Sequence, residues 1–475
     1  MNIQLAILIG YILLLGVVSW FAVKIQNRGG GGSMLNYLMA GKSLPTSLVA
    51  VMLTGLAIGG ASTVGVAENA YTAGISAGWY NGAWGTGGIL VGLFAARYFR
   101  KMNVNTVPEM MGIMFGPSSR LLGVIIQLLV MISITSLQYV AGGAILTALL
   151  PDIFTFQQGM IASAVIFIGI TVVGGYWASG LTNIINVIVI YIGIIAALIG
   201  ATSSLGGFSA IQATLPAGGH WFEPISGMGT AIVTAWMVVM VTQCFSTQAI
   251  AQISFAAKDE KTARNGFLIG GILILPAGFL CSLFGIMAAA KFPGLPNAAL
   301  ALPTIVSQLS PLVGGIFLAG LWAADVSTAV GLLMGCSTLV IQDVWKQLYT
   351  KPVSARSELL ISRAIVLGVS LLSFLLALSV VGILKTLTTA LAITTSFSLL
   401  IMANIYVPHL CKKASGFWIL LASLLLWIMW TYVPSLRIGP HLIYLEWVVC
   451  FAIFTICAII CKEPAGRLLP DNGNK

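Results

Sequence analysis

The sequence predicts an all-α membrane protein that crosses the bilayer about thirteen times. Of its 475 residues, 59% are hydrophobic and only 7% are charged, and the mean hydropathy is +1.03. A soluble domain does not have this balance, because its surface needs many more charged side chains. Apolar runs of about 20 residues, the length that crosses a bilayer, recur along the whole chain.

The predicted spans follow one another with mostly short connections. The N-terminus lacks the basic segment and the small-residue cleavage site of a signal peptide, so we expect the first span to be retained. In order, the spans cover residues 2–24, 44–71, 75–97, 118–150, 158–176, 180–202, 227–250, 265–290, 310–342, 359–383, 386–408, 416–433 and 442–461.

Basic residues predict the orientation of these spans. If the loop after the first span is cytoplasmic, nineteen of the 22 Lys and Arg residues fall on the cytoplasmic side, and only Lys291, Lys385 and Arg437 fall outside. Lys and Arg gather on cytoplasmic loops, so we expect the N-terminus outside and the C-terminus in the cytoplasm of a cell inner membrane. The net charge of +10 is explained in the same way. The expected partner is therefore the lipid bilayer and not a nucleic acid.

Three other features are assigned no chemistry. The stretch RGGGGS at 28–33 has the composition of a flexible linker. The seven cysteines lie mostly in apolar runs without metal-ligand spacing, so we interpret them as small buried residues. The loop 203–226 is the longest outer connection, and we expect a surface loop that partly covers an outer vestibule.

The second span has the composition of a helix that breaks inside the membrane. Gly59 and Gly60 lie in its middle, flanked by Thr54, Ser62 and Thr63. A break at membrane depth is tolerated where the freed backbone groups face protein or a watery cavity. Freed carbonyls beside small hydroxyls are suited to a hard cation. The alternative is a glycine-rich helix that only packs closely against its neighbours.

The ninth span offers a second set of oxygen ligands. Ala324, Ser327 and Thr328 share one helix face because they are three and four residues apart. Hydroxyl and carbonyl oxygens are the ligands that hard cations prefer. The alternative is that both hydroxyls only bond back to carbonyls of their own helix, as is common in membrane helices.

Three acidic residues lie within or near the spans. Asp325 is in the middle of the ninth span, where a carboxylate costs about 2.5–3.5 kcal/mol on insertion scales, so we expect it to face the interior and to act in transport. It lies about 60° around the helix from Thr328 and is thus beside the hydroxyl face. Glu68 is a weaker candidate, since it is close to a span end, and Glu446 is expected at the membrane interface.

Buried amides and hydroxyls supply candidates for a solute pocket. The seventh span ends in Thr242, Gln243, Ser246, Thr247 and Gln248, and other spans contribute Asn81, Gln138 and Asn183. Some of these groups must bond helix to helix, because buried amides need partners. We expect the others to line a pocket for a small polar solute.

Common enzyme motifs are absent from the sequence. It contains no Walker A, HExxH or GxSxG motif, and its three histidines fall in loops or at span ends. We therefore expect no enzymatic activity and no ATP hydrolysis by this chain.

Several segments resemble the sodium:solute symporter family over nearly the whole chain. They are LNYLMAGKSLP (35–45), GVAENAYTAGISAGWY (65–80), GGYWASGLTNIINVIVI (174–190), AAKDEKTAR (256–264) and AADVSTAVGLLMGCSTLVIQDVW (323–345). The resemblance implies a five-plus-five inverted repeat whose first and sixth core helices are broken. The first repeat would be 44–202 and the second 227–408, with peripheral segments at 1–43 and 409–475.

The same resemblance implies sodium-coupled import of a solute by alternating access. Carried over residue by residue, it implies a sodium site made by carbonyls of Gly55, Ile58 and Ala324 and hydroxyls of Ser327 and Thr328. Sodium is the only metal expected. The solute would contact residues from several spans, namely Ser62, Thr63, Asn81, Gln138, Gln243 and Thr247.

Two positions depart from the family pattern. Many members have an aspartate where this chain has Asn183, and most have an apolar residue where it has Asp325. We hypothesise that Asp325 supplies the missing charge to sodium, a proton or a cationic solute. Glu68 is kept beside these two residues as a coupling candidate.

The substrate stays open at this stage. The candidate solute classes that the resemblance implies are an amino acid, a carboxylate, a vitamin, a sugar and an organic cation, and the end of the second span is faintly similar to the choline-transporting branch. Ala57 and Thr247 are not aromatic, which argues against a choline cage. We expect a monomer. The rival hypotheses are a proton-coupled carrier using Asp325 or Glu68 and a solute-sensing membrane module.

Overall fold

The computed structural model describes residues 3–28, 34–349, 354–379 and 383–468, and within these ranges the chain is helices joined by turns and loops. Only two isolated bridges, and no strand, occur in the described residues. The predicted all-α class is confirmed. Residues 29–33 of the predicted linker lie outside the described residues.

The α-helices of the first half of the chain are α1 (Ile3–Arg28), α2 (Met34–Met39), α3 (Thr46–Ala57), α4 (Gly60–Ala73), α5 (Trp79–Phe94), α6 (Ala96–Lys101), α7 (Val107–Phe115), α8 (Pro117–Leu149), α9 (Phe156–Ser204) and α10 (Phe208–Thr214). Those of the second half are α11 (Thr230–Cys244), α12 (Gln248–Phe255), α13 (Glu260–Ile274), α14 (Ala277–Lys291), α15 (Ala301–Ser307), α16 (Pro311–Leu339), α17 (Lys346–Leu348), α18 (Ala355–Ala377), α19 (Ile383–Ala392), α20 (Thr395–Tyr406), α21 (Lys413–Tyr432) and α22 (Leu442–Ile460).

Over its described residues every predicted span is mostly helical, but the count of thirteen stays a prediction. Within the described residues, eight helices are long and apolar enough to cross a membrane, or eleven if each of three bent pairs is one span. The predicted span 75–97 corresponds to α5, which continues from α4 in one stretch, Ser62–Phe94. The predicted span 158–176 corresponds to the beginning of α9, whose apolar part Phe156–Gly169 is shorter than a full crossing. Gly175, with φ 63°, separates it from the rest of α9.

Both predicted helix breaks are present. α3 meets the stretch Ser62–Phe94, which begins within α4, at 42°, and α11 and α12 also meet at 42°. Between α3 and α4, Gly59 is extended, with φ −85° and ψ 174°. The helix ladder is therefore interrupted at the glycine pair that the sequence singled out.

A third bend, of 43° between α19 and α20, was not predicted. Three consecutive hydroxyls, on Thr394, Thr395 and Ser396, each donate to the carbonyl three residues earlier, at 2.7–2.9 Å. These short-range bonds compete with the helix ladder and satisfy carbonyls that the bend would leave unpaired.

α16 is the centre of the bundle. Its apolar stretch is 89% buried, whereas those of α1, α21 and α22 are 22–28% buried and expose apolar side chains as a lipid-facing helix does. α16 packs against α1, α8 and α9. Small residues allow this approach: a Cβ added at Gly320 would lie 2.6 Å from the Val189 side chain.

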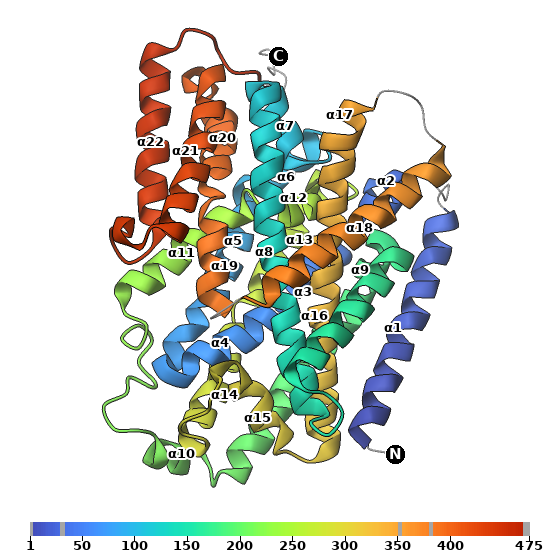
Figure 1. Cartoon of the computed structure of the whole chain (residues 1–475), viewed down its shortest axis with the longest axis vertical. Coiled ribbons are helices and arrows are strands. Elements are labelled where there is room, and N and C mark those ends of the chain that lie inside the picture. The colour runs from blue at the N-terminus through green and yellow to red at the C-terminus, as the bar shows by residue number, and fades with distance from the viewer. Residues whose placement is uncertain (1–2, 29–33, 350–353, 380–382, 469–475) are drawn as a thin grey trace.

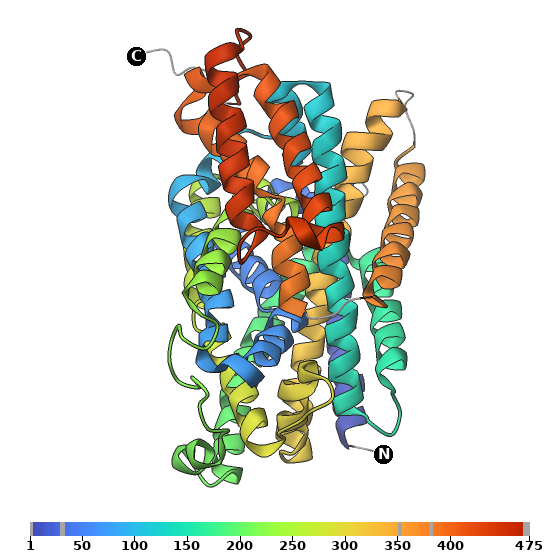
Figure 2. The same cartoon turned by 60° about the vertical axis from the view of Figure 1, so that its left-hand side comes forward.

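Different helices and termini lie at the two ends of the molecule. In Figure 1 the N-terminus and α10 lie at one end, and the C-terminus, α7 and α17 lie at the other. Figure 2 shows the same separation and places α21 and α22 side by side at the edge of the bundle. Termini at opposite ends agree with an odd number of crossings.

Candidate ion and solute site

The break between α3 and α4 is stabilised by hydroxyls from the next turn. Ser62 Oγ donates to the carbonyls of Ala57 and Gly59, and Thr63 Oγ1 donates to the carbonyl of Gly59 at 2.9 Å. The Ser and Thr that follow the glycine pair therefore satisfy backbone groups that the break frees.

Oxygens of α3 and α16 meet beside this break. Thr328 Oγ1 lies 2.8 Å from the Gly55 carbonyl oxygen and 3.0 Å from that of Ala324. Ser327 Oγ lies 2.8 Å from the Ala324 oxygen. All four residues are buried. The structure thus brings together four of the five predicted sodium ligands in a cluster that contains only neutral oxygens, which suits a hard cation.

The fifth predicted ligand, Ile58, directly follows the end of α3. Its backbone has left the helix, with φ −100° and ψ 50°, and its N–H donates to the Thr54 carbonyl. The next residue, Gly59, lies against Thr328: a Cβ there would be 2.5 Å from Thr328 Oγ1. No hydrogen bond of the Ile58 carbonyl oxygen is recorded in the described chain.

Asn183 of α9 borders the same cluster. Its Oδ1 accepts a hydrogen bond from Ser327 Oγ at 2.9 Å. A Cβ added at Gly55 would lie 2.2 Å from that oxygen, so the amide fills the space beside this glycine. The predicted second-ion residue therefore contacts the ion cluster directly, as a neutral group.

Gly59→Ala is expected to weaken sodium binding roughly 5- to 150-fold, because overpacking by a methyl group costs about 1–3 kcal/mol and about 1.4 kcal/mol is a factor of ten. The added Cβ would displace Thr328 Oγ1 from the cluster. Sodium titration of the thermal stability of the purified variant measures this effect. Gly368→Ala is the matched control, since nothing lies within 4 Å of a Cβ there. An unchanged sodium response in Gly59→Ala would contradict the placement of the site.

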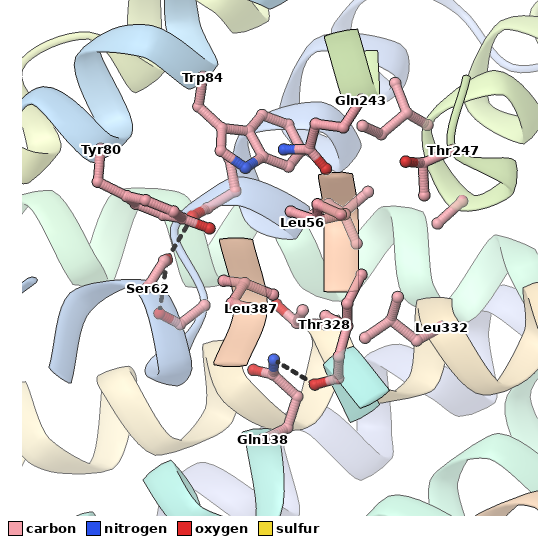
Figure 3. A pocket seen from close by; sticks show the side chains of 16 residues that line it. Leu56, Ser62, Tyr80, Trp84, Gln138, Gln243, Thr247, Thr328, Leu332 and Leu387 are labelled. Atoms are coloured by element: carbon pink, nitrogen blue, oxygen red, sulfur yellow. Dashed lines mark hydrogen bonds between the residues drawn. The ribbon is translucent and has the colours of Figure 1, made fainter. Parts of the chain in front are cut away.

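A cavity with a volume of about 40 Å³ adjoins the ion cluster. The residues that line it come from α3, α4, α5, α8, α11, α12, α16 and α19 and the breaks between them: Leu56, Ala57, Gly59, Ser62, Tyr80, Trp84, Ile134, Gln138, Gln243, Thr247, Ala249, Ile250, Thr328, Leu332, Leu387 and Leu391. In Figure 3, Tyr80, Trp84 and Gln243 lie on one side of the cavity and Gln138 lies across from them.

Four of the six predicted solute ligands line this cavity: Ser62, Gln138, Gln243 and Thr247. Thr63 does not, because its hydroxyl bonds to carbonyls at the start of its own helix. Asn81 does not either. It is fully buried, and its Cβ would be 2.9 Å from a Cβ at Gly278 of α14.

Tyr80 and Trp84 were missed at the sequence level. They lie four residues apart on α5, so both point to one side of the helix and into the cavity. Their spacing was visible in the sequence, but aromatic residues are common in any apolar span. Tyr80 and Trp84 are cavity residues because α5 lies beside both broken helices, and that position is a property of the fold.

Asp325 and Glu68 lie outside both the ion cluster and the cavity lining. A Cβ at Gly60 would be 2.6 Å from Asp325 Cγ, and one at Gly142 would be 3.0 Å from Asp325 Oδ2, so this carboxyl lies between the start of α4 and α8. The exposed fraction of Asp325 is 0%. Glu68 is half-buried, and its Oε2 accepts a hydrogen bond from the Ile383 N–H at the start of α19, at 3.1 Å.

Comparison with known proteins identifies the family. The sodium:solute symporter family model matches residues 37–420. The chain belongs to this family. The match includes all the residues of the ion cluster and of the cavity.

Relatives and solved structures agree with this assignment. The sodium/glucose cotransporter of Vibrio parahaemolyticus is 26% identical, over 73% of this chain and 69% of the relative. The sodium/pantothenate symporter of Escherichia coli is 28% identical, over 78% and 79%. The fold matches that of a Na⁺-coupled sialic acid symporter in a substrate-bound outward-open state, with a TM-score of 0.80 at 18% identity over 99% of this chain and 100% of that one. It also matches the nucleobase-cation symporter Mhp1, with a TM-score of 0.60 at 14% identity over 89% and 92%.

Family membership establishes the general function. The protein is a multi-pass membrane transporter that couples the movement of a small solute to sodium, and it is not an enzyme. The relatives differ in the solutes that their names give, including glucose, pantothenate and proline.

Proposed function

We propose that this symporter imports a small polar organic solute by alternating access, with one sodium ion at Gly55, Ile58, Ala324, Ser327 and Thr328. The observation that carries the proposal is the position of Thr328. Its hydroxyl on α16 donates to the Gly55 carbonyl of α3, and its side chain also lines the cavity. One side chain thereby links the ion cluster to the solute cavity. The proposed solute contacts are Ser62, Gln138, Gln243 and Thr247. We propose that Thr63 and Asn81, which do not line the cavity, support these contacts.

Coupling follows from the two sides of the ion cluster. Its ligands belong to α3 and the break on one side and to α16 on the other. An ion that needs both sets stabilises the conformation in which the two helices meet. It can shift the protein between conformations only because its affinity for them differs. Gly59 and Ser62 of the same break line the cavity, so the conformation that holds sodium also forms part of the solute site. The membrane potential adds about 2.3 kcal/mol per charge per 100 mV.

The remaining features of the proposal concern the whole chain. Residues 44–202 and 227–408 act as two repeats that move against each other, and 1–43 and 409–475 are peripheral. The protein is a monomer in the cell inner membrane, with the N-terminus outside and the C-terminus in the cytoplasm. The basic residues near span ends support this orientation.

Asp325 is the proposed second coupling group, with Asn183 and Glu68 as further candidates. Burying a carboxyl within a span costs free energy, so such a residue is expected to act in transport. Asp325 is fully buried and lies where α4 begins. This observation also favours a second candidate function, a carrier coupled to protons through Asp325 or Glu68.

Uptake into proteoliposomes separates the two candidate functions. An inward sodium gradient at equal pH is expected to drive accumulation of the solute, and replacing sodium by potassium or choline is expected to abolish it. Accumulation driven by a proton gradient without sodium would overturn the sodium proposal in favour of the proton-coupled carrier.

Gln138→Leu is expected to raise the KM for the solute roughly 10- to 100-fold, because an unpaired polar group costs about 1–3 kcal/mol. Gln138 Nε2 donates to the Ile134 carbonyl, while Oε1 has no partner among the described residues and belongs to a cavity-lining side chain. Uptake kinetics measure the change. Ser133→Ala, at an exposed hydroxyl on the same helix, is the control. A loss of sodium-dependent stabilisation in Gln138→Leu would mean that the residue acts on the ion site instead.

A further inference from the structure

The cavity wall contains no formal charge. Its sixteen lining residues, all within the described chain, include no Asp, Glu, Lys, Arg or His. A charged group moved from water into such a site loses its hydration without gaining an ion pair with the cavity wall, and this loss is large. Tyr80 and Trp84 on one side and Leu387 and Leu391 on α19 instead offer apolar and aromatic surface.

Two polar atoms at the cavity need a partner that the protein does not supply. Gln138 Oε1 and Thr247 Oγ1 have no hydrogen-bond partner among the described residues, and both side chains are 2% exposed. Both residues line the cavity. An amide oxygen only accepts hydrogen bonds, so the missing partner of Gln138 must be an N–H or O–H donor.

The helix ends that could attract a negative group already have an oxygen-bearing side chain beside them. Half-helix N-termini in transporters bind anionic parts of substrates. At the start of α4, the Asp325 carboxyl lies against Gly60, the residue that follows the cavity-lining Gly59. At the start of α12, the Gln248 N–H donates to Gln127 Oε1 at 3.0 Å. A solute carboxylate at the α3–α4 break would therefore meet a like charge from Asp325.

We infer that the solute is uncharged, has no carboxylate, and donates an N–H or O–H group to Gln138 Oε1. In this arrangement Asp325 determines specificity by excluding anions from the break between α3 and α4. The solute class fits a polyol, a sugar or an amide with an apolar or ring face toward Tyr80 and Trp84. This inference rests on the cavity being the solute site.

Charge fractionation of a bacterial small-molecule extract tests the inference before the solute itself is identified. A cation exchanger at acidic pH removes cations and zwitterions, and an anion exchanger then removes acids. The three fractions are added to the purified full-length protein, with and without sodium, and its thermal stability is measured. We expect sodium-dependent stabilisation by the unretained fraction only.

Matched pairs then test the carboxylate directly. D-glucose and D-glucuronate, nicotinamide and nicotinate, and pantothenol and pantothenate differ at the acid group. For any pair that competes with the active fraction, the uncharged member is expected to bind at least tenfold more tightly. Activity in the anion- or cation-exchanger fraction, activity in no fraction, or tighter binding of the acid would overturn the inference. Stabilisation by sodium alone is measured in the same plate, and its absence would instead contradict the sodium site.

Discussion

Thr328→Val is expected to raise the sodium concentration for half-maximal uptake roughly 10- to 100-fold, because a hydrogen-bonding group that serves a charge is worth about 1.5–3 kcal/mol. Valine keeps the shape of the side chain and removes only the hydroxyl. That hydroxyl lies 2.8 Å from the Gly55 carbonyl oxygen and 3.0 Å from the Ala324 carbonyl oxygen. The substitution therefore removes one oxygen ligand and a side-chain hydrogen bond that joins Gly55 to α16.

The same variant tests the coupling of ion and solute. Thr328 also lines the cavity, so solute affinity is expected to fall with sodium affinity. Solute binding at saturating sodium should recover toward the wild-type value, since the remaining ligands still assemble the site when enough sodium is present. Uptake and thermal stability, each titrated with sodium, measure the two effects.

Thr171→Val is the matched control for Thr328→Val. Thr171 is a fully buried threonine in α9 whose hydroxyl donates only to its own helix, at the Phe167 carbonyl. It should change stability by about 1 kcal/mol and leave sodium affinity unaltered. Equal sodium affinity in both valine variants would refute the role of Thr328 as a ligand.

The sequence was sufficient to predict the broken helix and the shared face of Ala324, Ser327 and Thr328. Gly59 and Gly60 mark the break because a glycine pair among small hydroxyls weakens a helix, and the three-residue spacing of Ala324 and Ser327 fixes their shared face. Which helix faces which was not visible in either segment. The family resemblance brought α3 and α16 together, and the contact between Thr328 and Gly55 agrees with it.

Neighbouring helices decide what the sequence alone did not show. Glu446 was expected at the membrane interface, and that depth stays a prediction; its side chain is fully buried, and its Oε2 accepts a hydrogen bond from Ser423 of α21 at 2.6 Å. The bend after α19 was missed because a run of hydroxyls in an apolar helix more often faces a neighbouring span. Tyr80 and Trp84 could not be told from packing residues until the position of α5 was known.

Asp325 shows the same limit at a single residue. Its position around the helix placed it beside the hydroxyl face, and its carboxylate made it a candidate for an ion ligand. The structure instead directs the carboxyl toward Gly60 and Gly142 and Thr328 toward Gly59. One turn of α16 therefore contacts the broken span on both sides of its break.

Asp325→Asn is expected to change two properties together. The half-maximal sodium concentration should rise roughly tenfold, the effect of losing about 1.4 kcal/mol of attraction between a nearby negative charge and the cation. The carboxylate members of the matched solute pairs should also compete at least tenfold better than they do against the wild type. Both changes follow from removing one negative charge at the start of α4 while keeping the shape of the side chain.

Asp152→Asn is the control for this charge, because Asp152 lies exposed in the loop between α8 and α9. Uptake at several pH values distinguishes the remaining roles of Asp325. A fixed negative charge predicts that sodium affinity falls in Asp325→Asn at every pH tested. A proton carrier predicts instead that a proton gradient drives uptake in the wild type and fails to do so in the variant. Wild-type sodium affinity together with unchanged rejection of carboxylates would leave Asp325 as a packing residue, and the specificity argument would then be wrong.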